Sequence, residues 1–435
     1  MNVAVLGLWH LGSVTAACVA AAGHHVTAWD PDTGIAHRFA AGSPAVSEPG
    51  LAELVRVQAD AGRLTTATDL EAAVRPAEVV WITFDTPVDD EDRADVDSVV
   101  NHVAATFPYL RDDATVLISS QLPLGTARRL EELYATARPN GHATFASSPE
   151  NLRLGRALEV FNTPDRVVVG VRNERDRERI TRLFAPITDR LEWMSVESAE
   201  LTKHAINAFL ALSVAYINEL ATIGEQMGAD AREVERGLKT ERRIGPAAYL
   251  SPGGAFAGGT LARDVSFLRD LGGRLHCQTS IMDGVQASNR EHRGWARRRL
   301  SLELGSLADR RIAVCGLTYK PGTDTLRRSE AIVLCRWLLD QGANVAVHDP
   351  AVSELPDDLA ARLHRHEEPL QAAQGADAIV VATEWPHYRQ VPPDDLAPLM
   401  RDRLVVDANR FLGRTLGQDP RFRLISVGHP ITRHA

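Results

Sequence analysis

The sequence predicts an α/β protein with two Rossmann-like parallel-sheet domains, joined by a helical connector with a long central helix. Residues 3–30 and 311–349 share one order of elements: an apolar strand, a glycine turn, an amphipathic helix, a second strand and an acidic residue at its end. Such a βαβ unit contributes two parallel strands to a sheet. Between them, the periodic run from residue 197 to about 228 exceeds the usual length of a helix within one domain, which favours a role in bridging domains or subunits.

Each remaining element follows from its local pattern. Short apolar runs bounded by turn residues predict further strands at residues 79–83, 114–118, 166–170, 344–349, 378–382 and 404–407. Amphipathic periodicity predicts helices at residues 13–22 and 330–341. We therefore expect three regions, with residues 1–195 and 301–435 as the two sheet domains and residues 196–300 as the helical connector.

Composition narrows the class of protein. The 435 residues are 44% hydrophobic and 24% charged, which is typical of a soluble globular enzyme with two or three domains. A net charge of -9 without a Lys/Arg run argues against a nucleic-acid partner. The chain enters a strand without a signal-peptide pattern and lacks an apolar run of membrane-span length, so we expect a cytoplasmic protein. Four scattered cysteines lack metal spacing, which predicts reduced thiols and no metal site.

The first glycine turn matches most of a dinucleotide-binding fingerprint. Gly7 and Gly12 take the positions of its first and third glycines, and Asp30 lies where an acid would accept from a ribose 2′-hydroxyl. An acid there favours NAD over NADP. Trp9 stands in place of the middle glycine, so its side chain either points away from the pyrophosphate or crowds it. We assign cofactor contacts to the turn and this acid, namely Gly7, Trp9, His10, Leu11, Gly12 and Asp30.

The most informative stretch is a glycine-rich loop, Ser251-Pro-Gly-Gly-Ala-Phe-Ala-Gly-Gly-Thr-Leu-Ala-Arg-Asp264. It resembles the active-site loop of the UDP-glucose and GDP-mannose dehydrogenase family, the nucleotide-sugar dehydrogenases. In that family the loop carries a nucleophilic cysteine, followed four residues later by an aspartate. Here Asp264 is in place, but Thr260 stands at the position of the nucleophile. A threonine hydroxyl is a poor substitute for a thiol because its pKa is far higher.

Two further motifs carry the same resemblance. The segment from Glu200 to Asn207 resembles the family's central-helix signature, which implies that Lys203 and Asn207 stabilise a sugar oxygen as its proton leaves. Lysine is scarce here, since the chain contains only Lys203, Lys239 and Lys320. Residues 316–324, with Arg327 after them, resemble the family's C-terminal signature, which implies a phosphate or sugar contact for Lys320 and a pyrophosphate contact for Arg327.

Three motifs of the first domain match the family only in part. Thr86 lies in a turn that resembles the one beside the nicotinamide ribose, and Ser120 begins the motif of residues 120–126. In that motif Gln121 replaces the threonine that would meet the cofactor and the reacting centre. In residues 148–155, Glu150 keeps the first glutamate of the family pattern, whereas Leu154 replaces the second, which helps to activate the hydrolytic water in the family.

The resemblance also implies the remaining contacts. Residues 1–195 would bind NAD, residues 301–435 would bind a UDP-type nucleotide sugar, and residues 196–300 would build a homodimer on the long helix. Arg243 would serve the site of the neighbouring subunit. The implied substrate contacts are Asn151, Leu152, Arg153, Arg243, Tyr249, Leu250, Gly254, Gly258 and Lys320.

The three replacements Gln121, Leu154 and Thr260 all affect the second oxidation and its hydrolysis. They favour an NAD-dependent oxidoreductase that acts on a nucleotide sugar by hydride transfer without a thioester. A variant of this hypothesis oxidises the hydrated aldehyde directly, with Thr260 holding the gem-diol. Two alternatives remain open: a catalytically silent nucleotide-sugar binding protein, and an NAD-dependent epimerase with transient oxidation.

Overall fold

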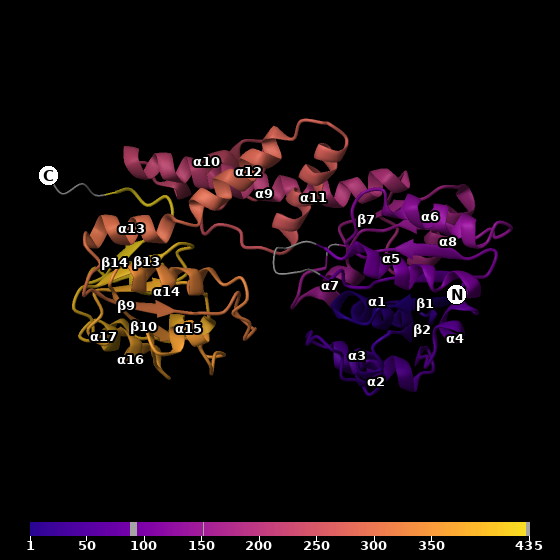
Figure 1. Ribbon diagram of the computed structural model, residues 1–435, viewed down its shortest axis with the longest axis horizontal. Coiled ribbons are helices and arrows are strands. Elements are labelled where there is room, and N and C mark those ends of the chain that lie inside the picture. Colours follow the sequence, from indigo (N-terminus) through magenta and orange to yellow (C-terminus); the bar gives the residue numbers. More distant parts are fainter. Residues whose placement is uncertain (88–93, 151, 432–435) are drawn as a thin grey trace. The chain divides into compact units, whose positions relative to one another are not determined.

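The computed structural model describes residues 1–87, 94–150 and 152–431, in two compact units (Figure 1). Unit 1 comprises Met1–Ile206 and unit 2 comprises Asn207–Ala435. The boundary between the units falls inside one long helix, α9 (Val196–Met227). Each unit is described by itself below.

Unit 1 is built on an eight-stranded sheet with the order β3-β2-β1-β4-β5-β6-β7-β8, in which only the pair β6–β7 is antiparallel. The strands are β1 (Asn2–Leu6), β2 (His25–Trp29), β3 (Leu64–Thr66), β4 (Val79–Ile82), β5 (Thr115–Ile118), β6 (Thr144–Ser147), β7 (Val167–Gly170) and β8 (Leu191–Met194). The central strands β4 and β5 are buried at every residue, which explains why they read as continuous apolar runs.

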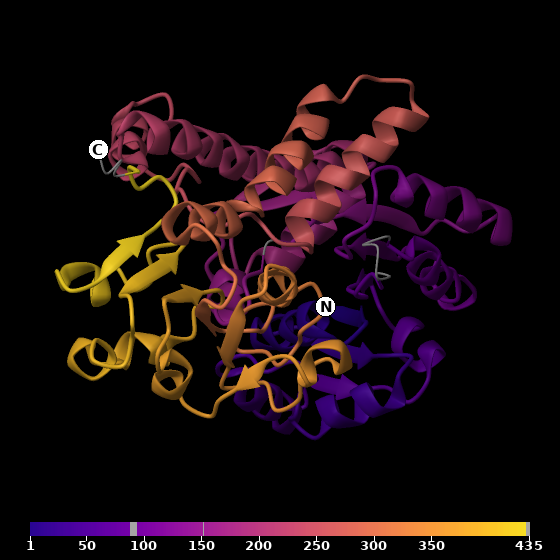
Figure 2. The same ribbon diagram turned by 60° about the vertical axis from the view of Figure 1, so that its left-hand side comes forward.

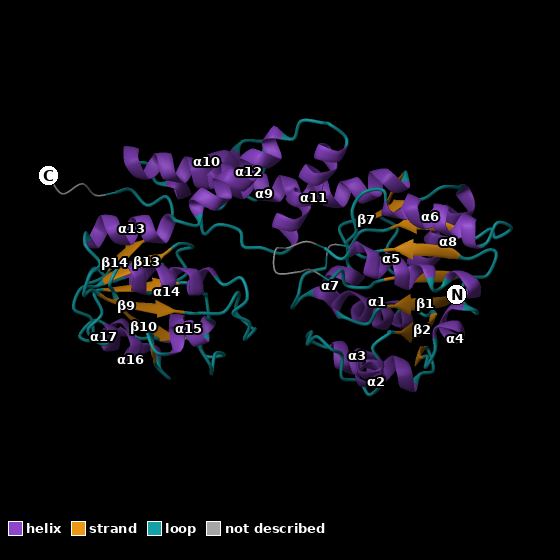
Figure 3. Cartoon of the chain, in the orientation of Figure 1, coloured by secondary structure: helices purple, strands orange, loops and turns teal. Residues whose placement is uncertain are grey.

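Helices cover both faces of this sheet (Figure 3). Alternate residues of β1 serve two cores, because Val3 and Val5 belong to one apolar cluster while Ala4 and Leu6 belong to another. Asp32, Asp69, Asp95 and Asn173 cap the starts of α2, α4, α5 and α8 with their side chains. The helices are α1 (His10–Ala21), α2 (Thr33–Ala40), α3 (Leu51–Asp60), α4 (Leu70–Val74), α5 (Val96–Ala104), α6 (Thr126–Ala137), α7 (Ala157–Asn162) and α8 (Glu174–Phe184).

Unit 2 combines helices with a six-stranded, all-parallel sheet of order β11-β10-β9-β12-β13-β14. The strands are β9 (Arg311–Cys315), β10 (Asn344–His348), β11 (His364–Arg365), β12 (Ala378–Val381), β13 (Leu404–Asp407) and β14 (Arg423–Ile425). From one edge this order repeats the order of the first six strands of unit 1. The two Rossmann-like sheets and the long central helix confirm the predicted fold class.

The helical part of unit 2 precedes its sheet. Helices α11 and α12 pack side by side as a hairpin (Figure 2). The helices are α10 (Ala231–Thr240), α11 (Thr260–Arg274), α12 (Ser280–His292), α13 (Trp295–Leu304), α14 (Glu330–Asp340), α15 (Asp357–Ala360), α16 (Pro369–Ala373) and α17 (Pro393–Leu396).

Helix α9 corrects one expectation from the sequence. By length and composition alone it could cross a membrane, although no run of that kind was expected. Within its most apolar window, 44% of the residues are buried inside the structure. The core helix of a soluble protein passes the same test, so this finding is weak evidence for a membrane span.

Candidate active site

The first glycine turn has a geometry that only glycine allows. Gly7 follows β1 with a φ of +97°, and a Cβ atom there would lie 2.7 Å from the backbone of Phe84. A Cβ atom on Gly12 would lie 1.6 Å from the carbonyl oxygen of Gly7. Helix α1 begins at His10, so its first amides face the space beyond this turn. The close approach of strand and helix therefore requires both glycines.

Asp30 lies directly after β2, where its carboxylate closes the same turn. Its Oδ2 atom accepts a hydrogen bond from the Leu8 amide at 2.6 Å, and Oδ1 accepts from the Asp32 amide at 2.9 Å. Burial raises the pKa of Asp30, and the two amides oppose that effect. Asp30 thus stands at the end of the second strand, as the fingerprint predicts.

Trp9 stands at the position of the middle glycine, directly before α1. It is the N-cap residue of α1, its carbonyl oxygen accepts the Ser13 amide at 3.0 Å, and 44% of its surface is exposed. The indole is therefore not packed into the domain, and the turn keeps its regular hydrogen bonding. His10 and Leu11, both half-buried, form the start of α1 beside it.

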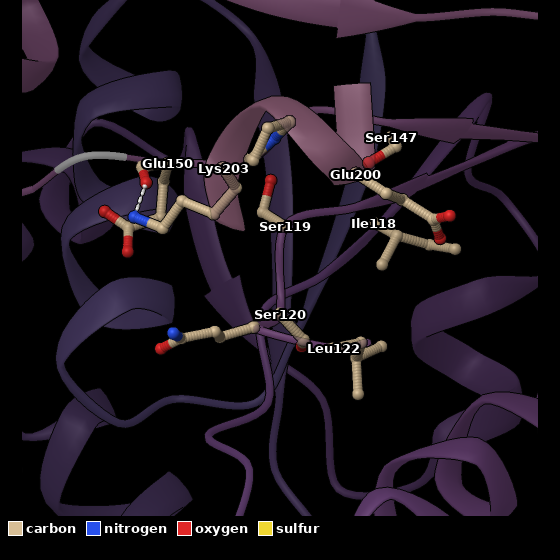
Figure 4. A pocket seen from close by; sticks show the side chains of 10 residues that line it. Ile118, Ser119, Ser120, Leu122, Ser147, Glu150, Glu200 and Lys203 are labelled. Atoms are coloured by element: carbon tan, nitrogen blue, oxygen red, sulfur yellow. Dashed lines mark hydrogen bonds between the residues drawn. The ribbon is translucent and has the colours of Figure 1, made fainter. Parts of the chain in front are cut away.

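A pocket in unit 1 gathers several of the predicted residues (Figure 4). Its lining includes Ser120, Gln121, Glu150 and Lys203. The Lys203 ammonium donates to the carbonyl oxygen of Glu150 at 2.5 Å. The Ser120 hydroxyl is buried without a hydrogen-bond partner in the part of the chain that the structure describes. An ammonium and an unsatisfied hydroxyl in one hollow provide two polar contacts for a ligand.

Neighbouring residues hold this pocket in shape. Thr86 is buried and donates through its hydroxyl to the carbonyl oxygen of Gln121 at 2.8 Å. The carboxylate of Glu150 accepts a hydrogen bond from the Leu152 amide. Leu154 is 52% exposed. Asn151 lies outside the described residues, so its predicted contact cannot be placed.

Glu200 in the pocket wall and His204, four residues later on α9, were not identified as site residues from the sequence. Glu200 accepts from the amides of Gly125 and Ala127 at 2.8 and 2.9 Å, and thus caps the start of α6 from another element. Burial raises the pKa of Glu200. His204 bonds the carbonyl oxygen of Leu122 at 3.0 Å. Because both residues belong to α9, they tie the first turns of that helix to residues 120–126.

In unit 2, the structure brings Asn207 and Asp264 together. The amide of Asn207 donates to the Asp264 carboxylate, and both residues are buried. The Asp264 carboxylate thus orients the Asn207 amide. Thr260 is the exposed first residue of α11, one turn before Asp264. Thr260 thus ends the glycine loop at the start of a helix.

Side chains from four elements hold the backbone of the glycine loop. Asn289 on α12 bonds Phe256 twice, accepting from its amide at 3.0 Å and donating to its carbonyl oxygen at 2.8 Å. The other loop contacts are His292 Nε2 to Gly253 O, Asn218 Oδ1 to Gly253 N, Asn409 Oδ1 to Gly254 N and Tyr319 OH to Gly258 O, at 2.7–3.0 Å. These contacts order a loop whose glycines would otherwise leave it mobile.

The remaining predicted substrate contacts differ in exposure. The Arg243 side chain is 88% exposed and pairs with Glu241 at 3.0 Å, while Tyr249 is 56% exposed. Leu250 is buried. The exposed positions also include Arg153, Lys320 and Arg327.

Known proteins resemble the chain over its whole length. Models of the UDP-glucose/GDP-mannose dehydrogenase family match in order: the NAD binding domain at residues 1–188, the central domain at 197–291 and the UDP binding domain at 313–414. The UDP-glucose 6-dehydrogenase of Pseudomonas aeruginosa is 33% identical, with 100% of this chain and 99% of that protein covered. The chain belongs to this family.

Two further relatives agree with this assignment. The UDP-glucose 6-dehydrogenase of Rhizobium meliloti is 33% identical over 99% of this chain and 100% of that protein. The solved structure of a UDP-glucose dehydrogenase from Pyrobaculum islandicum superposes with a TM-score of 0.85 at 30% identity, covering 99% of this chain and 98% of that one. The protein is therefore an NAD-dependent oxidoreductase of the nucleotide-sugar dehydrogenase type.

The residues of unit 1 fit NAD, which accepts a hydride from the sugar carbon in such an enzyme. A Cβ atom would fill the turn at Gly7 and Gly12, and Asp30 lies where the fingerprint places the acid for a ribose. In the sheet of unit 2, the corresponding acid is Asp349. Its Oδ2 atom already accepts from the Leu317 amide, the Thr318 amide and the Trp385 indole at 2.6–3.0 Å. Asp349 thus closes the turn of the second Rossmann-like domain as Asp30 closes that of the first, with the Thr318 amide and the Trp385 indole as additional donors.

Proposed function

We propose that this dehydrogenase oxidises a CH–OH group of a UDP-linked sugar, with UDP-glucose as the first candidate, and stops after one hydride transfer. The UDP binding domain and the named relatives support the substrate class. The replacement of the nucleophile by Thr260 supports the single step, because a thioester requires a thiol. The product would be an aldehyde or a ketone that leaves without covalent attachment.

None of the four cysteines of the chain is suited to replace the thiol that is missing at position 260. Burial raises the pKa of the thiols of Cys18, Cys315 and Cys335 to about 12, so all three stay protonated at neutral pH. Cys277 is exposed, but it follows the C-terminal end of α11, whereas Thr260 begins that helix. Fifteen helical residues separate the two ends by roughly 22 Å. This arrangement is the observation that carries the proposal.

We propose the following roles for the residues of the candidate site. Lys203 stabilises the oxygen of the sugar as its proton leaves, and Ser120 and Gln121 contact the cofactor side of the same pocket. Asn207 binds the same sugar oxygen, while Asp264 fixes the orientation of the Asn207 amide. Thr260 donates a hydrogen bond to the oxidised carbon's oxygen. Glu150 acts through its carbonyl oxygen, which positions the Lys203 ammonium.

Mass spectrometry of the denatured protein tests the absence of a covalent step. Wild-type protein quenched during turnover with NAD and UDP-glucose should carry no sugar adduct, because the Thr260 hydroxyl does not capture the aldehyde and no ester forms. Thr260→Cys restores a thiol at that position and should accumulate an adduct, since Gln121 and Leu154 leave its hydrolysis slow. A sugar adduct on Thr260 of the wild type would refute the mechanism. No NADH formation with any UDP-sugar would refute the activity itself.

We further propose a cytoplasmic homodimer that pairs along α9. Phe209, Tyr216 and Ile223 are spaced by seven residues on this helix and are 66%, 47% and 61% exposed. A seven-residue apolar stripe is the pattern of helices that pair with one another. Replacing all three with glutamate should give a monomer in light scattering. A wild-type monomer at micromolar concentration would contradict this pairing.

A further inference from the structure

Glu48 is a buried carboxylate that the proposed chemistry does not use. It precedes α3, and its side chain is only 1% exposed. One oxygen accepts from His10 Nε2 at 2.9 Å and from the Gly155 amide at 2.8 Å; the other accepts from the Ala157 amide at 2.8 Å. Burying a charge costs less free energy when three donors surround it than when it is buried alone. The three donors therefore stabilise the Glu48 carboxylate in its buried position.

The hydrogen-bond partners of the Glu48 carboxylate lie in two different parts of unit 1. His10 is the first residue of α1, next to the turn that fits the NAD pyrophosphate. Gly155 and Ala157 belong to the segment that runs from β6 into α7. The same segment includes Glu150, whose carbonyl oxygen holds the Lys203 ammonium. Glu48 is thus shared between the cofactor turn and the segment that positions the ammonium.

The protonation of the pair follows from these contacts. Burial alone would raise the pKa of Glu48, but the hydrogen bonds from His10 and the two amides outweigh it and hold the pKa below its usual range. The carboxylate is therefore ionised at neutral pH and can only accept hydrogen bonds. His10 Nε2 must consequently carry a proton and donate it to Glu48.

We propose that Glu48 is a positioning residue that couples NAD binding at the first glycine turn to the placement of Gly155 and Ala157, in the segment that leads into α7. A pyrophosphate at the start of α1 fixes His10, His10 fixes the carboxylate, and the carboxylate fixes the amides of Gly155 and Ala157. The coupling deepens the proposed function, since the segment it orders carries Glu150. It requires only NAD binding and neither the sugar nor the single hydride step.

Hydrogen exchange with NAD as the only ligand tests the coupling. In the wild type, NAD should slow amide exchange at Gly155 and Ala157. In Glu48→Gln, this NAD-dependent protection should disappear, and the Kd for NAD by calorimetry should rise at least about tenfold, as expected for a lost charged hydrogen bond. The matched control is Glu53→Gln on α3, a carboxylate that is 70% exposed and pairs with Arg56. This control should keep both the Kd and the protection.

His10→Phe provides a second test that leaves Glu48 and its two amide contacts in place. It should abolish the same NAD-dependent protection, and adding it to Glu48→Gln should raise the Kd for NAD little further. Because this variant keeps the buried carboxylate bonded to Gly155 and Ala157, it decides the proposal even where Glu48→Gln fails to fold. Unchanged protection by NAD in either folded variant overturns the coupling. These readouts need no turnover, so absence of activity with UDP-glucose leaves their meaning intact.

Discussion

Lys203→Met removes the ammonium that the proposed chemistry requires and keeps an unbranched side chain in its place. In the structure this ammonium lines the pocket with Ser120 and Gln121 and donates to the Glu150 carbonyl oxygen at 2.5 Å. The substitution therefore deletes one charged donor at the sugar oxygen and one donor that Glu150 uses. Neither loss is compensated by the thioether, which is only a weak acceptor.

The two losses have different sizes and different readouts. Removing one donor to a developing oxyanion lowers kcat by about 10² to 10³, or about 2.7 to 4 kcal/mol of transition-state stabilisation. Leaving the Glu150 carbonyl without its donor costs about 1 kcal/mol of folding stability, at the low end because Lys203 is half-buried and water can reach the site. We therefore expect a large fall in kcat with a small change in melting temperature.

The assay is the steady-state rate of NADH formation with NAD and UDP-glucose, analysed for kcat and KM separately. Lys239→Met is the matched control, because Lys239 pairs with Glu235 on α10 and lies outside the proposed site. Its loss should leave kcat unchanged. A kcat for Lys203→Met within about threefold of the wild type would refute the role of the ammonium, because that factor corresponds to less than 1 kcal/mol.

Three further predictions concern the loop, the pH dependence and the cofactor turn. Asn289→Leu removes the side-chain partner of both backbone groups of Phe256 in the glycine loop. The KM for the UDP-sugar should therefore rise about tenfold or more, while the Kd for NAD stays unchanged. Equal effects on both ligands would contradict this role of the loop. Burial lowers the pKa of His292, so the unfolded chain binds a proton that the folded chain does not, and stability should fall as the pH drops below about 6.5. His292→Gln should make that fall shallower by at most about 1.4 kcal/mol per pH unit in urea titrations, and an unchanged slope would show that His292 does not contribute. Gly12→Ala places a methyl group against Gly7 and should abolish NAD binding in calorimetry, whereas retained affinity would contradict the tight turn.

The sequence predicted most interior strands of both sheets, but it missed the edge strands and the interior strand β6. Strands β4 and β12 are buried at every residue and therefore appear as unbroken apolar runs. The edge strands β3 and β11 have only three and two residues, partly exposed and partly polar, and carry no such signal. Their pairing depends on the neighbouring strand rather than on their own composition.

The candidate site was predictable where one local motif carries the geometry. Gly7, Gly12 and Asp30 lie within one βαβ unit, so their relation follows from spacing. Glu48 contacts Ala157 across 109 residues of chain, and Asn289 contacts Phe256 across 33. A carboxylate before a helix gives no sign of such partners. Only the folded chain reveals which segments Glu48 and Asn289 hold.

The central claim is that the chain oxidises its sugar once because Thr260 cannot capture the aldehyde. The most direct test is the number of NADH molecules formed per UDP-glucose consumed at completion, with the product identified by nuclear magnetic resonance. The account predicts one NADH per sugar and an uncharged oxidised sugar. Two NADH per sugar together with a uronic acid would contradict it.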